Sequence, residues 1–248
     1  MKKLKSEILA INKKTEEISE FILWVSEDLG FINWQFLTIN IPQEKIIERN
    51  WEKIIKNIFI KRAYSIVEII DQKIVLWIKN ISWKWTTYLF SREIWDKLDI
   101  SWSFWNFFVK WEQDNLCFMA TWIWIPPIIS HLKFIFEQNK NLFKNKKIFL
   151  AYWIRKKTDF FCEEILNNFS KENKNFSYKI FFSREDEKIS EENENFEKWY
   201  CTKIFENKNL DFQNTEFYFC GSLLLMKEIW EKLKEKLVEK DRFVFEAY

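Results

Sequence analysis

Two short segments of the chain carry hydroxyl side chains in an order that could bind phosphate. Residues 82–87 hold Ser82 and Thr86, and residues 121–126 begin with Thr121 directly after an apolar run. A turn of this kind, placed between a strand and a helix, brings backbone N–H groups close to a pyrophosphate. Both segments are therefore predicted nucleotide-binding loops, although each contains two tryptophans where such a turn normally needs glycine.

Tryptophan and glycine occur in numbers far from their ordinary usage. The 248 residues include 15 Trp and 2 Gly, whereas glycine usually makes up about 7% of a protein. At 33–34 and 50–51, Trp follows Asn where an Asn-Gly turn would be ordinary. Our hypothesis is that UGA codons were translated as Trp where the native cell reads them as Gly. The alternative is a non-enzymatic binding protein whose real indoles stack on sugars or bases.

A third candidate site is the tetrapeptide 62–65, which follows an apolar run. The guanidinium of Arg62 can bind a phosphate. The Tyr64 ring can lie against another aromatic ring, and the Ser65 hydroxyl can reach a ring nitrogen. Taken alone, the tetrapeptide is equally an ordinary strand end.

The predicted secondary structure that would hold these segments differs between the two halves of the chain. Residues from about 18 to 110 read as short strands separated by turns, which predicts an antiparallel barrel. These strands are predicted at 36–41, 54–60, 73–78 and 106–110. Further along, strands are predicted at 116–120, 147–152, 179–182 and 216–219, and helices at 127–138, 159–168 and 223–237.

Strand–helix alternation in the second half predicts a parallel sheet with right-handed crossovers. The fold class is therefore β plus α/β, with an N-terminal antiparallel β-barrel followed by a parallel-sheet α/β domain. The predicted domains are 1–112 and 113–248. The acidic segment 185–198 is predicted to be a solvated loop.

Charge and cysteine spacing exclude several functions. The formal net charge of +2 gives no case for nucleic acid or an acidic membrane. The four cysteines are scattered with no C-x-x-C pair, which supports neither a zinc site nor an iron–sulfur cluster, so no metal is expected. Scattered thiols fit a reducing cytoplasm. No apolar stretch is long enough for a signal peptide or a membrane span.

Read in order, and with Trp taken as Gly, the segments resemble the ferredoxin–NADP reductase family of flavoproteins. The flavin-binding half of that family has an F-x-x-G-Q turn, an R-x-Y-S strand, a G-x-x-[ST] loop, a G-D turn and a G-P-x-G-x-F turn. The matching segments here are 31–36, 62–65, 82–89, 95–96 and 102–107, with Ser103 where the family often has Pro. The resemblance implies that FAD is bound by Arg62, Ala63, Tyr64, Ser65, Trp85, Thr86 and Thr87.

The second half continues the resemblance in the family's order. Residues 119–126 are similar to its G-T-G-I-A-P nucleotide loop, 153–155 to its G-x-R segment, 220–221 to its C-G segment and 245–248 to its aromatic C-terminus. The implied NAD(P)-binding residues are Thr121, Trp122, Ile123, Trp124, Pro126, Arg155, Ser183, Arg184, Cys220, Gly221 and Tyr248. Ser183-Arg184 resembles the plant-type pair that holds the 2′-phosphate, which favours NADP over NAD.

The family resemblance implies an enzyme that moves electrons between NAD(P)H and a one-electron carrier through FAD. Ferredoxin or a flavodoxin-like protein is the expected carrier. Four residues are the implied catalytic candidates that orient hydride transfer: Ser65, Cys220, Glu246 and Tyr248.

Other interpretations remain open from the sequence. The chain could be an electron-transfer or flavin reductase subunit of a larger enzyme, such as a dihydroorotate dehydrogenase-type complex, and it could act as a monomer or within such a complex. Arg184 could be a solvated loop residue, Cys220 a core thiol and Tyr248 a frayed end. His131, the single histidine, is expected to pack on a helix or lie at the surface.

Overall fold

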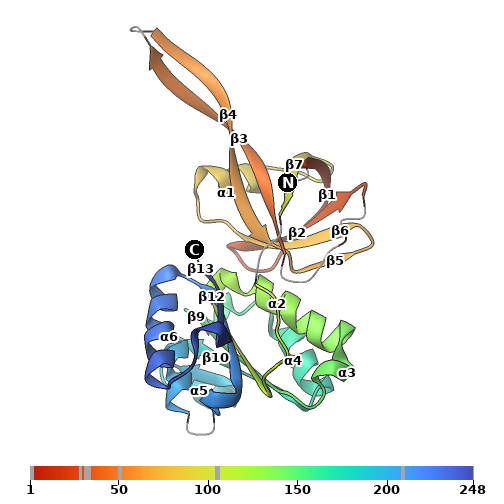
Figure 1. Ribbon diagram of the computed structural model, residues 1–248. Helices are drawn as coiled ribbons and strands as arrows, with labels where there is room; N and C mark the ends of the chain where they lie inside the picture. The colour runs from red at the N-terminus through yellow and green to blue at the C-terminus, as the bar shows by residue number, and fades with distance from the viewer. Residues whose placement is uncertain are drawn as a thin grey trace. The chain divides into compact units, whose positions relative to one another are not determined.

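The computed structural model describes residues 3–27, 30, 35–49, 52–103, 107–207 and 210–247. The chain divides into two compact units, Met1–Asn106 and Phe107–Tyr248. Each unit is built on its own sheet, as the two groups of strands in Figure 1 show.

The first unit is a seven-stranded antiparallel sheet in the order β4-β3-β7-β1-β2-β6-β5. Its elements are β1 (Lys3–Lys13), β2 (Ile18–Val25), β3 (Phe36–Arg49), β4 (Glu52–Ser65), β5 (Glu68–Ile70), β6 (Lys73–Lys79), α1 (Lys84–Phe90) and β7 (Lys97–Ser103). The two edge strands, β4 and β5, are joined by only Ile66 and Val67. Ile66 N–H donates to Gln35 O and Val67 N–H to Val75 O. The sheet therefore closes on itself, and the predicted antiparallel barrel is confirmed.

The barrel core follows from alternation along the strands. Successive side chains of a strand point to opposite faces. On β2 the buried residues Phe21, Leu23 and Val25 alternate with more exposed ones, and on β3 Leu37 and Ile39 do the same. These side chains form one apolar cluster with residues of β1, β6 and β7.

Strands β3 and β4 are longer than the sequence predicted. They pair without interruption from Phe36↔Ser65 to Arg49↔Glu52, whereas β7 pairs with β3 only as far as Ile39. The remainder is a two-stranded ribbon that extends away from the barrel (Figure 1). The predictions of 36–41 and 54–60 were too short because charged residues interrupt the apolar pattern along the ribbon.

The second unit is a six-stranded parallel sheet in the order β11-β10-β9-β8-β12-β13. Its strands are β8 (Asn115–Thr121), β9 (Lys147–Ile154), β10 (Phe176–Phe182), β11 (Phe196–Lys198), β12 (Thr215–Gly221) and β13 (Phe243–Ala247). Its α-helices are α2 (Pro126–Lys133), α3 (Lys140–Phe143), α4 (Glu163–Glu172), α5 (Ile189–Glu192) and α6 (Leu223–Glu235). The predicted parallel α/β architecture is confirmed.

Three local predictions in the second unit were wrong. Residues 107–110 are not a strand: Phe107 and Val109 are buried and Phe108 is exposed, but none of the described strands pairs with this segment. The helix predicted from 159 begins only at Glu163, after a single 3₁₀ turn (Lys157–Asp159). The predicted loop 185–198 contains α5 and β11, since Ile189 and Phe196 bury their side chains within it.

None of the helices in the part of the chain that the structure describes is long and apolar enough to cross a bilayer.

Candidate functional site

The order of the parallel strands fixes where a ligand can bind in the second unit. The chain builds β8 first, then β9, β10 and β11 on one side of it, and finally β12 and β13 on the other. Open parallel sheets bind ligands at the carboxyl ends of the strands, at the point where the strand order reverses. That point lies between the ends of β8 and β12, where Thr121 and Ser222 stand.

A hollow of about 490 Å³ opens at this point. Four strands end at it, so residues far apart in the sequence share one surface. Its lining is Thr121, Trp122, Trp124, Trp153, Ile154, Arg155, Ser183, Arg184, Tyr200 and Ser222. Six of these were predicted as NAD(P)-binding residues from the sequence.

Gly221, the last residue of β12, does not line the hollow and has no room for a side chain. A Cβ there would lie 2.6 Å from Thr121 Oγ1 and 2.6 Å from the Phe219 ring. The Thr121 hydroxyl is buried and has no hydrogen-bond partner among the described residues. The chain's own side chains therefore fill the space at Gly221. The unsatisfied Thr121 hydroxyl, which lines the hollow, fits a polar ligand, and a dinucleotide phosphate or ribose supplies such groups.

The loop after β8 bends sharply and leads directly into a helix. Trp122 has φ of 48°, a left-handed conformation that side chains other than glycine rarely adopt. The Tyr152 hydroxyl donates to the Trp122 carbonyl at 2.7 Å. Helix α2 then begins with Pro126 and Pro127 and has no side-chain cap. Since proline has no backbone N–H, the first N–H of the helix is that of Ile128.

The basic residues of the hollow are positioned by backbone bonds between β9 and β10. Ser183 N–H donates to Ile154 O at 3.1 Å, and Arg184 N–H donates to Arg155 O at 2.9 Å. The guanidinium of Arg155 lies over the Trp122 ring, 3.9 Å from its centroid. The two arginines therefore stand at adjacent strand ends, where they can bind anionic groups.

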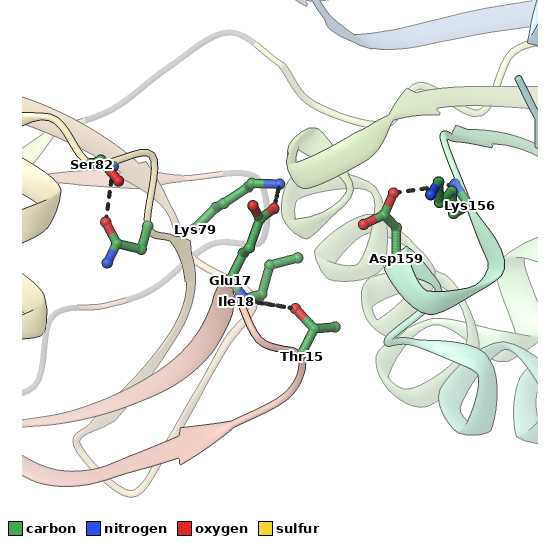
Figure 2. A network of polar contacts seen from close by, with 8 residues as sticks. Thr15, Glu17, Ile18, Lys79, Ser82, Lys156 and Asp159 are labelled. Carbon is green, nitrogen blue, oxygen red and sulfur yellow. Dashed lines mark hydrogen bonds and ion pairs between the residues drawn. The ribbon is translucent and has the colours of Figure 1, made fainter. Parts of the chain in front are cut away.

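The turn after Arg155 is held by a local bond. The Asp159 carboxylate accepts from Lys156 N–H at 3.2 Å, as Figure 2 shows. Lys157 N–H donates to Glu185 Oε1 at 2.8 Å, which links this turn to the segment that follows Arg184.

Cys220 and Glu246 are neighbours on the paired strands β12 and β13. Both are buried. Burial raises the pKa of the Cys220 thiol well above its usual range, and the Glu246 charge raises it further. The thiol therefore stays protonated. Neither residue lines the hollow, and Tyr248 lies outside the described residues.

In the first unit, the end of β4 meets the start of α1. The Arg62 guanidinium lies over the Trp85 ring, 4.1 Å from its centroid, and the Trp83 and Trp85 rings meet edge to face at 4.5 Å. The Tyr64 hydroxyl is buried and has no hydrogen-bond partner among the described residues. Burial raises its pKa above the usual range. A buried phenol without a partner fits a cofactor that supplies one.

The loop before α1 is shaped by an Asn side chain. The Asn80 carboxamide oxygen accepts from Ser82 N–H at 3.0 Å (Figure 2), and Ser82 has φ of 58°. The buried Thr86 hydroxyl donates to Trp83 O at 3.0 Å. Thr87 is exposed on the first turn of α1. Next to this loop, Lys79 forms an ion pair with Glu17.

The structure brings most of the predicted residues of each unit together and leaves others apart. Ala63 and Ser65 lie on the opposite face of β4 from Arg62 and Tyr64, because strand side chains alternate. Ile123 and Pro126 belong to the nucleotide loop but do not line the hollow.

Four residues of the hollow were not predicted: Trp153, Ile154, Tyr200 and Ser222. Ser222 could have been found, because it lies between the predicted strand 216–219 and the predicted helix 223–237. It caps α6 by accepting from Leu225 N–H. Tyr200 was missed because the preceding acidic segment was interpreted as a loop.

Comparisons with known proteins agree with this geometry. Residues 113–232 match the ferric reductase NAD binding domain family. A subunit of the Na(+)-translocating NADH-quinone reductase of Shewanella denitrificans is 27% identical over 168 residues, which cover 66% of this chain and 40% of that protein. The corresponding subunit of Serratia proteamaculans is 24% identical and aligns with 100% of this chain and 68% of its own length.

A solved structure has the same fold over both units. It is a ferredoxin NADP+ reductase from Neisseria gonorrhoeae with bound FAD and NADP, with a TM-score of 0.75 and 15% identity. The likeness covers 100% of this chain and 99% of that one.

Proposed function

Since the chain belongs to the ferredoxin–NADP reductase-like flavoproteins, we propose that it moves electrons between NAD(P)H and a one-electron carrier through FAD. The observation that carries this proposal is the hollow at the strand-order reversal, which combines the unsatisfied Thr121 hydroxyl with Ser183 and Arg184. The unit Met1–Asn106 is proposed to bind FAD, and Phe107–Tyr248 to bind the nicotinamide nucleotide.

FAD, when bound, supplies hydride acceptance and one-electron release, so the protein supplies geometry and electrostatics. In the second unit, the Thr121 hydroxyl and the backbone N–H groups of the loop 122–124 would hold phosphate, and Arg155 would neutralise its charge. In the first unit, Arg62, Tyr64 and the residues Trp85, Thr86 and Thr87 would hold the flavin nucleotide. Ser65 is proposed to orient the reacting ring from the same strand.

Cys220, Glu246 and Tyr248 are proposed to orient the nicotinamide. The protonated Cys220 thiol offers an uncharged contact, which suits a neutral ring better than a thiolate would. Glu246 is held beside it by strand pairing.

NADP is proposed over NAD because of Ser183 and Arg184. The Arg184 side chain is exposed at the rim of the hollow, where a guanidinium can make a bidentate contact with a 2′-phosphate. NAD would leave that guanidinium without an anionic partner.

The proposed acceptor is a ferredoxin or flavodoxin-like carrier. A second candidate function is an electron-transfer subunit of a larger enzyme. It is favoured by the relatives, because this chain spans 40% of the length of the first relative, which is itself named as a subunit. We also propose a cytoplasmic location, since all four cysteines are buried free thiols.

The recoding hypothesis is retained as a proposal for the native residues. Trp95 and Trp122 have φ of 77° and 48°, and forcing an ordinary residue into such a conformation costs about 1–3 kcal/mol. The Asn50-Trp51 pair, where an Asn-Gly turn would be ordinary, lies outside the described residues. Trp77 and Trp230 do not show this strain. The Trp77 indole donates to Glu20 from β6, and the Trp230 ring stacks on Phe243 from α6.

Anaerobic reduction tests the proposed reaction. The FAD-loaded chain is mixed with NADPH or with NADH, and the reduced protein is then mixed with oxidised ferredoxin or flavodoxin. We expect faster flavin reduction by NADPH than by NADH, followed by reoxidation by a carrier. Reduction by neither nucleotide would contradict the proposal, and reduction without reoxidation by either carrier would favour the subunit of a larger enzyme.

A further inference from the structure

The segment 107–110, which leads into β8, is held by two side chains rather than by strand pairing. The carbonyl of Phe107 lies 2.7 Å from Nε2 of His131, on α2. The backbone N–H of Lys110 donates to the hydroxyl of Tyr218, on β12, at 2.8 Å. Phe107 and Val109 are buried, so this irregular segment is part of the core of the second unit.

The imidazole of His131 is enclosed by aromatic rings. The Phe107 ring meets it edge to face at 4.7 Å, and the rings of Phe118 and Tyr218 lie 5.8 and 5.9 Å away. His131 itself is fully buried. Burial lowers its pKa to about 4, although its bonds to the backbone at Phe107 and Pro127 act in the opposite direction. The ring is therefore neutral near pH 7.

A neutral imidazole carries one N–H and can donate to only one carbonyl. Both of its nitrogens face carbonyl oxygens, because Nδ1 lies 2.6 Å from Pro127 O. Pro127 stands four residues before His131, so the helix itself supplies a donor to that carbonyl. Among the described residues, no backbone N–H donates to Phe107 O. The proton therefore stabilises the structure most when it is on Nε2.

We propose that His131 is a positioning residue, which holds the segment 107–110 through an Nε2–H bond to the Phe107 carbonyl. Helix α2, which carries His131, begins directly after the nucleotide loop at Pro126. The bond thus ties the segment that enters the second unit to the helix that presents the loop. Any effect of this bond on the reaction with NADPH rests on the proposed function. The bond between His131 and Phe107 itself does not depend on that function.

The first experiment reads the proton position directly. His131 is the single histidine of the chain, so a ¹⁵N-histidine spectrum of the unmodified protein shows one imidazole. We expect the neutral Nε2–H form with no titration between about pH 5 and 8. An Nδ1–H form, or titration near the ordinary histidine value, would overturn the proposal.

The second experiment uses a matched pair of variants. His131→Gln keeps a donor near the position of Nε2, and His131→Asn keeps one only near Nδ1. For His131→Asn we expect about tenfold faster hydrogen exchange of the Lys110 amide and about a tenfold higher KM for NADPH. His131→Gln should restore both to within about twofold.

Equal behaviour of the two variants would overturn the positioning role. Exchange that separates them without any change in KM would limit the role of His131 to the fold. If the protein shows no NADPH reaction at all, the proposed function fails while the ¹⁵N spectrum and amide exchange still decide on the bond. If neither variant folds, the spectrum of the unmodified protein still decides.

Discussion

In the parallel sheet, Thr121, Ser183 and Ser222 come from three strands far apart in the sequence, yet they line one hollow because parallel strands end at the same edge. In the antiparallel barrel, neighbouring strands run in opposite directions, so no common edge collects polar strand ends. There, Arg62 and Trp85 meet through a single stacking contact between a strand end and the start of a helix. In the second unit, the strand order alone shows where the binding site lies. In the first unit, the site can be identified only from contacts between individual side chains.

The largest expected effects come from two tryptophans, one in each unit. Trp77 is buried on β6 and donates from Nε1 to Glu20, so Trp77→Gly should lower the free energy of unfolding by about 3–5 kcal/mol. Trp122 is held at positive φ, so Trp122→Gly should raise it by about 1–3 kcal/mol. Urea unfolding of the two single variants measures both changes. Destabilisation by Trp122→Gly would argue against a native glycine at that position.

The chain's two glycines give a second contrast. Gly221→Ala places a Cβ 2.6 Å from Thr121 Oγ1, so it should cost about 1–3 kcal/mol and abolish nucleotide binding. Gly30→Ala meets no atom within 4 Å and should leave nucleotide binding unchanged, although its φ of 54° adds strain. Calorimetric titration with NADP+ compares the two. Normal binding by Gly221→Ala would mean that nucleotide binding does not depend on the position of the Thr121 hydroxyl beside Gly221.

Arg184 tests the specificity assigned to the rim of the hollow. Arg184→Ala should raise the KM for NADPH about tenfold and leave the KM for NADH nearly unchanged, since only the former carries the 2′-phosphate. Steady-state kinetics with both nucleotides provide the measurement. Arg92→Ala, an arginine on the barrel that pairs with Asp96, serves as the control. Equal losses for both nucleotides would assign Arg184 to the shared pyrophosphate.

The smallest stability effect is expected at the barrel site. Arg62→Ala removes the stacking contact with Trp85, which should cost about 0.5–1 kcal/mol of folding free energy. Flavin retention should fall more clearly than stability does, because the flavin phosphate would lose its guanidinium partner. Gel filtration followed by the visible spectrum measures retained flavin. Full retention would remove Arg62 from the proposed FAD site.

The sequence predicted the second unit better than the first. The strand before Thr121 and the helix after Pro126 were recognisable because an apolar run, a turn and a proline follow one another. Strand β11 was missed because Phe196 is one apolar residue among acidic neighbours. The long ribbon of β3 and β4 was missed because its pairing, not its apolar pattern, sets its length.

Within the site, the sequence identified residues that lie in motifs and missed those that arrive from elsewhere. Thr121 and Ser183 stand directly after predicted strands and Arg155 three residues after one, so their shared edge could be expected. Tyr200 lies in the segment directly after β11 and lines the hollow. No local sequence pattern predicted β11 or the segment after it. The contact of His131 with Phe107 joins residues 24 positions apart and depends on tertiary packing.

The visible absorption spectrum of two purified versions tests the central claim most directly. One version is the chain as printed, and the other carries glycine at 13 of the 15 tryptophan positions, with Trp77 and Trp230 kept. We expect a flavin spectrum in the glycine version that NADPH bleaches, with little or none in the printed version. Flavin in the printed version would make the recoding unnecessary, and flavin in neither would contradict the assignment as a flavin-dependent reductase.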